Sequence, residues 1–256
     1  MQRKNIKLEE IVELYNTYNN IGIIAEKLNC CTANISKRLR KAGISINRDY
    51  SKRRKSSREK LYVDESYFKS IDTEDKAYFL GLMYADGSVS KNTFYLKLKD
   101  EDIIQEFKKY LKAETNIKII NNQYSLTICR QSMCNDLINQ GCYINKTASI
   151  RFPFLDKKLM RHFIRGFYDG DGSLILNANR SHNCLNFTSG SLEFLQQLQD
   201  NLKGVSITNG GISKEKNYEV WHLRYGGKQV HIILDWLYNS SNLYLKRKYN
   251  KYLLSK

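Results

Sequence analysis

The 256-residue sequence predicts an α+β protein: two αββαββα repeats related by a pseudo-twofold axis, preceded by a small all-α domain. Two observations predict it. A nine-residue pattern, an apolar helix with two small residues four positions apart and a closing Asp-Gly, occurs twice. After each copy, segments with the hydrophobic periodicity of strands and of helices occur in the same order along the chain. We therefore expect one repeated unit to occupy most of the chain.

The two copies of the pattern are FLGLMYADG at 79–87 and IRGFYDGDG at 164–172. Each ends a predicted helix, the first starting at Thr73 and the second at Asp156, residue types that favour the N-cap. Gly87 and Gly172 follow the helices, where a left-handed residue commonly ends a helix.

Small residues stand four apart in both copies, Gly81 with Ala85 and Gly166 with Gly170. Positions i and i+4 share one helix face, and a face without side chains lets another helix approach closely. We expect these two faces to pack against each other.

One acid follows the second small residue in each copy: Asp86 and Asp171. Packing of the small-residue faces would therefore bring the two carboxylates together. Two ionised carboxylates at short distance repel each other and need a cation between them. Oxygen donors favour a hard ion such as Mg²⁺, although other divalent cations share this chemistry.

These motifs resemble those of two-motif LAGLIDADG homing endonucleases, and the resemblance runs from about Thr73 to the C-terminus. It implies a saddle of two four-stranded sheets over the DNA major groove. It also implies that Asp86 and Asp171 are the metal-binding catalytic acids. Motif one departs from the family at Tyr84, where an acid is common; Asp169 fills that position in motif two.

The resemblance further implies a lysine that enters the active site after the last helix of each repeat. Matching places hold Lys146 and Lys248, with Lys246 or Arg247 as possible substitutes. A single lysine is weak evidence in a chain with 42 lysines and arginines, and the matching positions are what favour the assignment.

The implied mechanism is metal-assisted phosphodiester hydrolysis. The expected metal ligands are the two acids and neighbouring backbone carbonyls, namely Asp86, Asp171, Ala85 and Gly170. Lys146 and Lys248 would stabilise the negative charge that develops on the phosphate during the reaction.

Residues 8–44 read as a small helical unit in which Ala25, Asn29 and Ile35 have the spacing of a helix-turn-helix. The third helix would present polar and basic side chains to DNA. Its candidate DNA contacts are Thr32, Asn34, Lys37, Arg38, Arg40 and Lys41. The alternative is a helical hairpin with a solvated basic face.

A basic segment follows, with seven lysines and arginines between 48 and 60. Such a segment cannot bury a core, and Arg53 and Arg54 are candidate phosphate contacts. A plain tether or a nuclear import signal are the alternatives. The expected organisation is a helix-turn-helix-like domain at 1–46, a basic linker at 47–70, repeat 1 at 71–150 and repeat 2 at 151–256.

Outward-facing residues of the predicted strands are candidate base readers. They are Tyr95, Lys97, Lys99, Arg130, Asn186, Thr188, His222 and Arg224. Further strands are expected at 117–120, 124–130, 173–176, 184–188, 205–212 and 220–225.

Bulk composition agrees with a polyanionic partner, since the net charge is +16. The sequence has no apolar run that could span a bilayer, no signal-peptide pattern, no Gly-rich phosphate loop and no CxxC pair. We expect an intracellular monomer with access to double-stranded DNA, no membrane partner and no small-molecule cofactor.

The sequence therefore predicts a Mg²⁺-dependent, site-specific double-strand DNA endonuclease that acts at a long asymmetric site. Two alternatives stay open: a non-cleaving DNA-binding regulator, and an intron-splicing maturase on the same fold.

Overall fold

The computed structural model describes residues 6–46, 61–143, 149–177 and 183–256. The chain divides into two compact units, Met1–Lys60 and Leu61–Lys256. In the described residues, no helix combines the length and apolar character that a membrane crossing requires.

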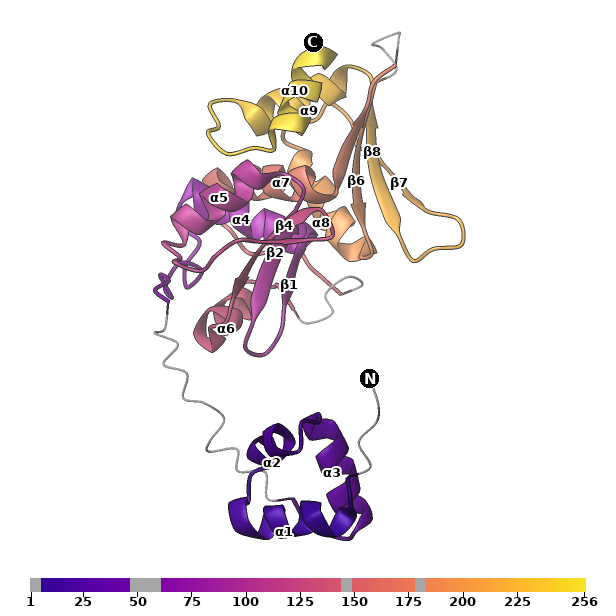
Figure 1. Ribbon diagram of the computed structural model, residues 1–256. Coiled ribbons are helices and arrows are strands. Elements are labelled where there is room, and N and C mark those ends of the chain that lie inside the picture. Colours follow the sequence, from indigo (N-terminus) through magenta and orange to yellow (C-terminus); the bar gives the residue numbers. More distant parts are fainter. Residues whose placement is uncertain (1–5, 47–60, 144–148, 178–182) are drawn as a thin grey trace. The chain divides into compact units, whose positions relative to one another are not determined.

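The first unit packs three helices around its own small core (Figure 1). They are α1 (Leu8–Tyr18), α2 (Ile21–Lys27) and α3 (Thr32–Lys41). Asn20 caps α2 by accepting hydrogen bonds from the amides of Gly22 and Ile23. Ala25 and Ile35 are buried, and Asn29 adopts the left-handed conformation (φ 47°). The three positions that suggested a helix-turn-helix are thus two core residues and one left-handed turn residue.

The second unit contains the αββαββα order twice, as predicted. Repeat 1 comprises α4 (Glu74–Ala85), β1 (Gly87–Val89), β2 (Phe94–Leu98), α5 (Glu101–Tyr110), β3 (Lys118–Ile120), β4 (Gln123–Ile128) and α6 (Gln131–Asn139). Repeat 2 comprises α7 (Lys157–Asp171), β5 (Gly172–Ile175), β6 (Cys184–Ser189), α8 (Leu192–Leu202), β7 (Gly211–Lys214), β8 (Trp221–Gly226) and α9 (Lys228–Tyr238). A further helix, α10 (Lys246–Ser255), ends the chain.

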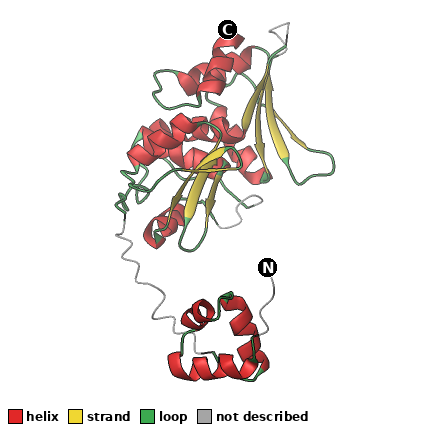
Figure 2. Cartoon of the chain, viewed as in Figure 1, coloured by secondary structure: helices red, strands yellow, loops and turns green. Residues whose placement is uncertain are grey.

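Each repeat forms one four-stranded antiparallel sheet, and the two sheets have matching strand orders, β1-β2-β4-β3 and β5-β6-β8-β7 (Figure 2). The β3–β4 turn has positive φ at both Asn121 and Asn122, the conformation of a type I′ hairpin. Helix α5 packs on the first sheet and α8 on the second. Both sheets therefore keep one face clear of these helices.

Helices α4 and α7 pack against each other and form the centre of the shared core (Figure 1). Alternating residues of the central strands point into this core, including Leu96 and Leu98 in β2 and Leu185 and Phe187 in β6. Their neighbours point to the opposite face, as the period of two requires.

The predicted linker at 47–70 is too long at its C-terminal end. Residues 61–70 belong to the second unit, because Val63, Tyr67 and Phe68 are buried in its core. The Asp64 amide also donates to the Leu111 carbonyl at 2.9 Å, which ties this segment to the end of α5. The remainder of the linker lies outside the described residues.

Two further expectations were wrong in detail. Gly87 and Gly172 do not have positive φ; Gly172 is extended (φ −86°) and both begin strands. A side chain at Gly172 would lie 2.1 Å from the Tyr168 ring, so the glycine is required for close approach. The strand expected at 205–212 begins only at Gly211, because the preceding residues form turns after α8.

Candidate active site and nucleic-acid interface

The glycines of the two motifs bring α4 and α7 into backbone contact. A Cβ atom at Gly81 would lie 2.1 Å from the Phe163 carbonyl oxygen and 2.7 Å from the Phe167 nitrogen. A Cβ at Gly166 would lie 2.0 Å from the Tyr78 carbonyl oxygen. No side chain fits at either position, so the small residues set the distance between the helices.

This packing places the two helix ends, and the acids that follow them, side by side. The Cβ position of Gly170 is 2.2 Å from the Ala85 Cβ and 2.9 Å from an Asp86 carboxylate oxygen. Gly170 directly precedes Asp171, which is exposed, whereas Asp86 is half-buried. The two sequence-predicted acids thus lie at one place in the structure, on neighbouring helix termini.

Lys248, from the first turn of α10, lies against the end of α7. Its ammonium donates to the carbonyl oxygens of Tyr168 (2.6 Å), Gly170 (3.1 Å) and Gly172 (2.6 Å). All three N–H bonds of the ammonium are therefore used, and the residue is only 8% exposed. A cation at a helix C-terminus also complements the helix dipole.

Burial lowers the pKa of Lys248 to about 8, and nearby Asp169, Asp86 and Asp171 oppose this shift. Both predicted catalytic acids are therefore close enough to act on its charge. At neutral pH the lysine still carries its proton and supplies positive charge beside the acids.

The other lysine candidates are placed differently. Lys146 lies outside the described residues. Lys246 pairs with Asp102 at 3.0 Å, and Arg247 pairs with Asp100 at 3.0 Å. These two side chains join α10 to the start of α5, and in this arrangement they do not replace Lys248.

A buried polar cluster lies next to Lys248, and sequence reasoning missed its role. Asp169 is fully buried; its carboxylate accepts from the hydroxyls of Tyr78 and Tyr238 and from the Leu245 amide, each at 2.8 Å. Arg165 is 1% exposed and donates to the carbonyls of Leu237 and Leu243. The available signal was two charged residues inside an otherwise apolar helix pattern.

Burial raises the pKa of Asp169, while the Leu245 amide, the Lys248 ammonium and the two tyrosine hydroxyls lower it. The backbone amide can only donate, so the hydrogen-bond pattern fits an ionised carboxylate. The nearby Arg165 guanidinium supplies the compensating charge that a buried carboxylate requires.

Most of the predicted reader residues share the helix-free faces of the two sheets. In the second sheet, Asn186 is paired with Arg224 and Thr188 with His222. Cross-strand partners point to the same side, opposite to the buried Leu185 and Phe187. In the first sheet, Tyr95 and Lys97 alternate with buried neighbours, and the exposed Lys99 follows the end of β2.

Hydrogen bonds hold several side chains on the clear face of the second sheet. On the second sheet, His222 Nδ1 lies 3.3 Å from the Thr188 hydroxyl and its Nε2 lies 3.3 Å from Glu215. Arg224 donates to the Ser213 hydroxyl at 2.9 Å. Side chains fixed by such contacts are suited to reading base edges.

Two predicted DNA contacts are engaged within the protein. Arg130 forms an ion pair with Glu65 at 2.9 Å and donates to the carbonyl of Leu61, so its guanidinium anchors the segment at 61–70. Arg38 is half-buried and donates to the carbonyl of Ile6. Both guanidinium groups thus have partners within their own unit. Arg53 and Arg54 lie outside the described residues.

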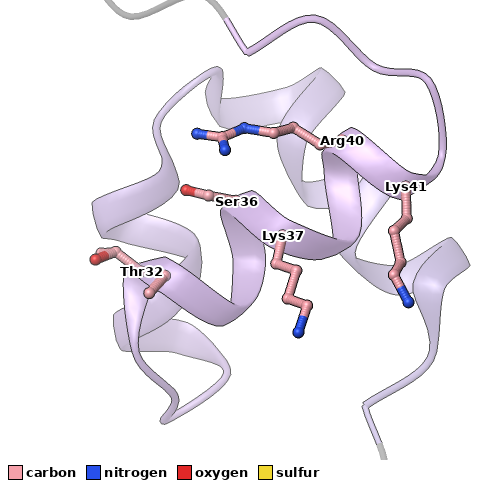
Figure 3. Close-up of a pocket in the computed structure, with 6 residues that line it drawn as sticks. Thr32, Ser36, Lys37, Arg40 and Lys41 are labelled. Carbon is pink, nitrogen blue, oxygen red and sulfur yellow. The ribbon is translucent and has the colours of Figure 1, made fainter.

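The remaining candidates of the first unit line a hollow along α3. Thr32, Ser36, Lys37, Arg40 and Lys41 form most of its surface, and no acid lines it (Figure 3). Asn34 is exposed on the same helix but does not line the hollow. The hollow therefore presents positive charge and hydroxyl groups from consecutive turns of one helix.

Comparison with known proteins identifies part of the second unit. The model of the LAGLIDADG-like domain matches residues 158–235. The chain is similar to uncharacterized protein MJ0314 of Methanocaldococcus jannaschii, with 29% identity over 140 residues, which cover 48% of this chain and 51% of that protein. It is also 27% identical, over 158 residues, to a probable translation initiation factor IF-2 from the same organism; the match covers 58% of this chain and 13% of the factor.

The chain thus spans about half the length of the first relative and a small part of the second. Two solved structures are similar at low identity. Full-length DUF199/WhiA from Thermatoga maritima is 18% identical with a TM-score of 0.49, covering 76% of this chain and 66% of that chain. The I-LtrWI LAGLIDADG homing endonuclease bound to target DNA is 14% identical with a TM-score of 0.46, covering 74% of this chain and 89% of that chain.

The matched residues begin within α7 and extend into α9, so they contain the second motif and both strand pairs of repeat 2. This match confirms, for that part of the chain, the resemblance seen in the sequence. Residues 158–235 of this protein are similar to the LAGLIDADG-like domain.

Proposed function

We propose that this protein is a divalent-metal-dependent DNA endonuclease that cuts both strands of a long, asymmetric site. The observation that carries the proposal is the convergence of Asp86 and Asp171 at the paired ends of α4 and α7. Two carboxylates beside helix-end carbonyls are the hard oxygen donors that Mg²⁺ prefers. The donor set therefore fits the metal, with Asp86, Asp171, Ala85 and Gly170 as its proposed ligands.

A divalent ion bound there would lower the pKa of an attacking water and stabilise the leaving 3′ oxygen. The protein's own residues would do the rest. Asp86 and Asp171 would hold the ion between the helix ends, and Lys248 would offset negative charge from its place against α7. Since its three N–H bonds already reach backbone carbonyls, Lys248 would act through its field, not through a direct phosphate contact.

DNA would be held by the helix-free faces of the two sheets. The two repeats carry different side chains there, which supports a target without twofold symmetry. The basic hollow on α3 would add contacts from the first unit, and the net charge of +16 would supply non-specific affinity. The match covers only a small part of a probable translation initiation factor. This supports the proposal that such a unit can lie within a larger protein of different function.

The test uses the full-length protein and a library of randomised duplexes, together with a duplex that joins the sequences flanking its own gene. We expect Mg²⁺-dependent cleavage that EDTA abolishes. Asp86→Asn and Asp171→Asn should each lower the cleavage rate roughly 10³-fold while DNA binding persists. Asp200→Asn, the same change on exposed α8, is the matched control and should leave the rate unchanged. Unchanged cleavage in Asp86→Asn would reject the assignment.

A second candidate function is DNA binding without cleavage. The observation that favours it is the basic hollow on α3, which is suited to binding and contributes nothing to hydrolysis. In that case the unmodified protein would retain duplexes from the library but cut none of them with Mg²⁺ or Mn²⁺. Splicing assistance would instead show as selective binding of the intron RNA over the matching duplex DNA.

A further inference from the structure

The loop between α9 and α10 is fastened to α7 by buried side chains of that helix. Arg165 donates to the carbonyls of Leu237 (3.0 Å) and Leu243 (2.8 Å), at the two sides of this loop. Asp169, one helical turn further along α7, accepts from the Leu245 amide at 2.8 Å. Leu243 and Leu245 are themselves buried, so the end of the loop that leads into α10 is fixed against the helix.

Leu245 is the residue from which α10 starts. It is the N-cap of that helix, with φ −75° and ψ 115°, and its carbonyl accepts from the Lys248 amide at 2.9 Å. The bond from the Leu245 amide to Asp169 therefore determines where the first turn of α10 lies. That turn carries Lys248, whose ammonium reaches the last carbonyls of the same helix α7.

The carboxylate of Asp169 is held from three directions. Tyr78 of α4 donates to one oxygen and Tyr238 of α9 to the other, both at 2.8 Å. The position of the acceptor is thus set by α4 and α9 as well as by α7. A group fixed this firmly can orient the element that depends on it.

We infer that Asp169 is a positioning residue, which anchors the N-cap of α10 and so places the Lys248 ammonium at the end of α7 beside Asp86 and Asp171. The inference rests on the proposed function only for its consequence in cleavage; the anchoring is a property of the protein without DNA. Repeat 1 has no equivalent carboxylate, because Tyr84 occupies the matching position and donates to the Gln140 carbonyl.

The direct test measures how fast the Lys248 amine is methylated by formaldehyde and borohydride, read by mass spectrometry on the full-length protein. Asp169→Leu removes the acceptor. Leu245→Pro removes the amide donor, and proline tolerates the φ of −75° found there. Leu245→Ala shortens the same buried side chain but keeps the amide, and it is the matched control. Asp169→Leu and Leu245→Pro should each raise the labelling rate of Lys248 roughly tenfold, as expected for the loss of one strong anchoring bond.

Two internal controls separate local release from general unfolding. Lys256, which follows the far end of the same helix and is already exposed, should label at an unchanged rate. The buried thiols of Cys134 and Cys142 in repeat 1 should stay unreactive. Tyr84→Phe, which removes a buried hydroxyl in repeat 1, should leave Lys248 protected.

If Lys248 stays protected in folded Asp169→Leu and Leu245→Pro, the inference is wrong. Reactive thiols in Asp169→Leu would mean that this variant has unfolded. The methylation rate of Lys248 in Leu245→Pro then decides whether the inference holds. Should the protein cleave DNA, Leu245→Pro should lower turnover and leave the DNA affinity unchanged. Absence of cleavage would reject the proposed function and leave the labelling result intact.

Discussion

Helices α4 and α7 are alike where they meet and different where they face their own repeats. At the contact, Gly81 and Gly166 allow the two backbones to touch. Away from it, α7 buries Arg165 and Asp169 where α4 has Leu80 and Tyr84 at the matching positions. The contact between the helices requires small residues at Gly81 and Gly166. On the faces that do not meet, the two helices carry different residue types at matching positions.

The divergence has a structural consequence for repeat 2. Buried charges need partners, and here the partners are backbone groups of the loop that leads to α10. Repeat 1 satisfies the matching position with one neutral hydrogen bond, from Tyr84 to the Gln140 carbonyl. The two helix ends therefore carry similar acids but are supported by different kinds of interaction.

The largest expected effect tests the part that the helices share. Gly81→Val would push side-chain atoms into the Phe163 carbonyl, which cannot move without separating the helices. We expect the free energy of unfolding to fall by about 4 kcal/mol or more, measured by urea denaturation. Gly204→Ala, at a position where a Cβ meets nothing within 4 Å, is the control and should change it little. A stable Gly81→Val protein would show that the close contact is not required.

The next effect compares two tyrosine hydroxyls, one from each repeat, that donate to a charged and to a neutral acceptor. Tyr238→Phe removes a hydrogen bond to a buried carboxylate, whereas Tyr84→Phe removes one to a neutral carbonyl. We expect losses of about 2 kcal/mol and about 1 kcal/mol respectively, because bonds to charged groups are stronger. Equal losses in urea unfolding would mean that Asp169 is not charged in the folded protein.

The third effect concerns pH and His162, which also lies on α7 and matches Ala77 on α4. Its Nδ1 lies 3.0 Å from an Arg165 nitrogen, and its Nε2 accepts from Arg161 at 3.2 Å and lies 3.4 Å from Glu74. Arginine can only donate, so both guanidinium groups favour the neutral imidazole. Burial, Arg165 and Arg161 lower the pKa of His162 to about 3, and these effects outweigh the attraction of the exposed Glu74 carboxylate.

The unfolded chain therefore binds a proton at His162 below about pH 6.5 that the folded protein does not bind. This contribution to stability is complete above that pH and is lost as the pH falls toward 3. Between pH 7.5 and pH 5.5 it should decrease by about 1.4 kcal/mol. In His162→Gln, the difference in unfolding free energy between these two pH values should be smaller by that amount. An unchanged difference would show that His162 is charged in the fold.

Sequence patterns predicted the helix contact because its cause is local: small residues four apart leave a flat helix face whatever surrounds it. They also predicted the order of strands and helices, since alternation in β2 and β6 reports which face is buried. Left-handed Asn29 was predictable for the same reason, as its conformation follows from a turn between two short helices.

The Asp169 cluster could not be predicted, because its partners come from α4, α9 and a loop more than 60 residues away along the chain. The partners of Arg130 and Arg38 could not be predicted for a related reason. A basic side chain near a strand end or on a basic helix looks available for DNA until its carbonyl and carboxylate partners are located. The segment at 61–70 is polar enough to resemble a linker, yet three of its side chains complete the core.

The hydroxyl of Tyr78 reaches Asp169 across the seam between the repeats. At the matching position, repeat 2 has Phe163, which has no hydroxyl. A homodimer assembled from two copies of repeat 2 would therefore leave each buried carboxylate short of one donor, and two copies of repeat 1 would have no carboxylate to satisfy. The buried carboxylate of repeat 2 therefore depends on a hydroxyl that only repeat 1 supplies.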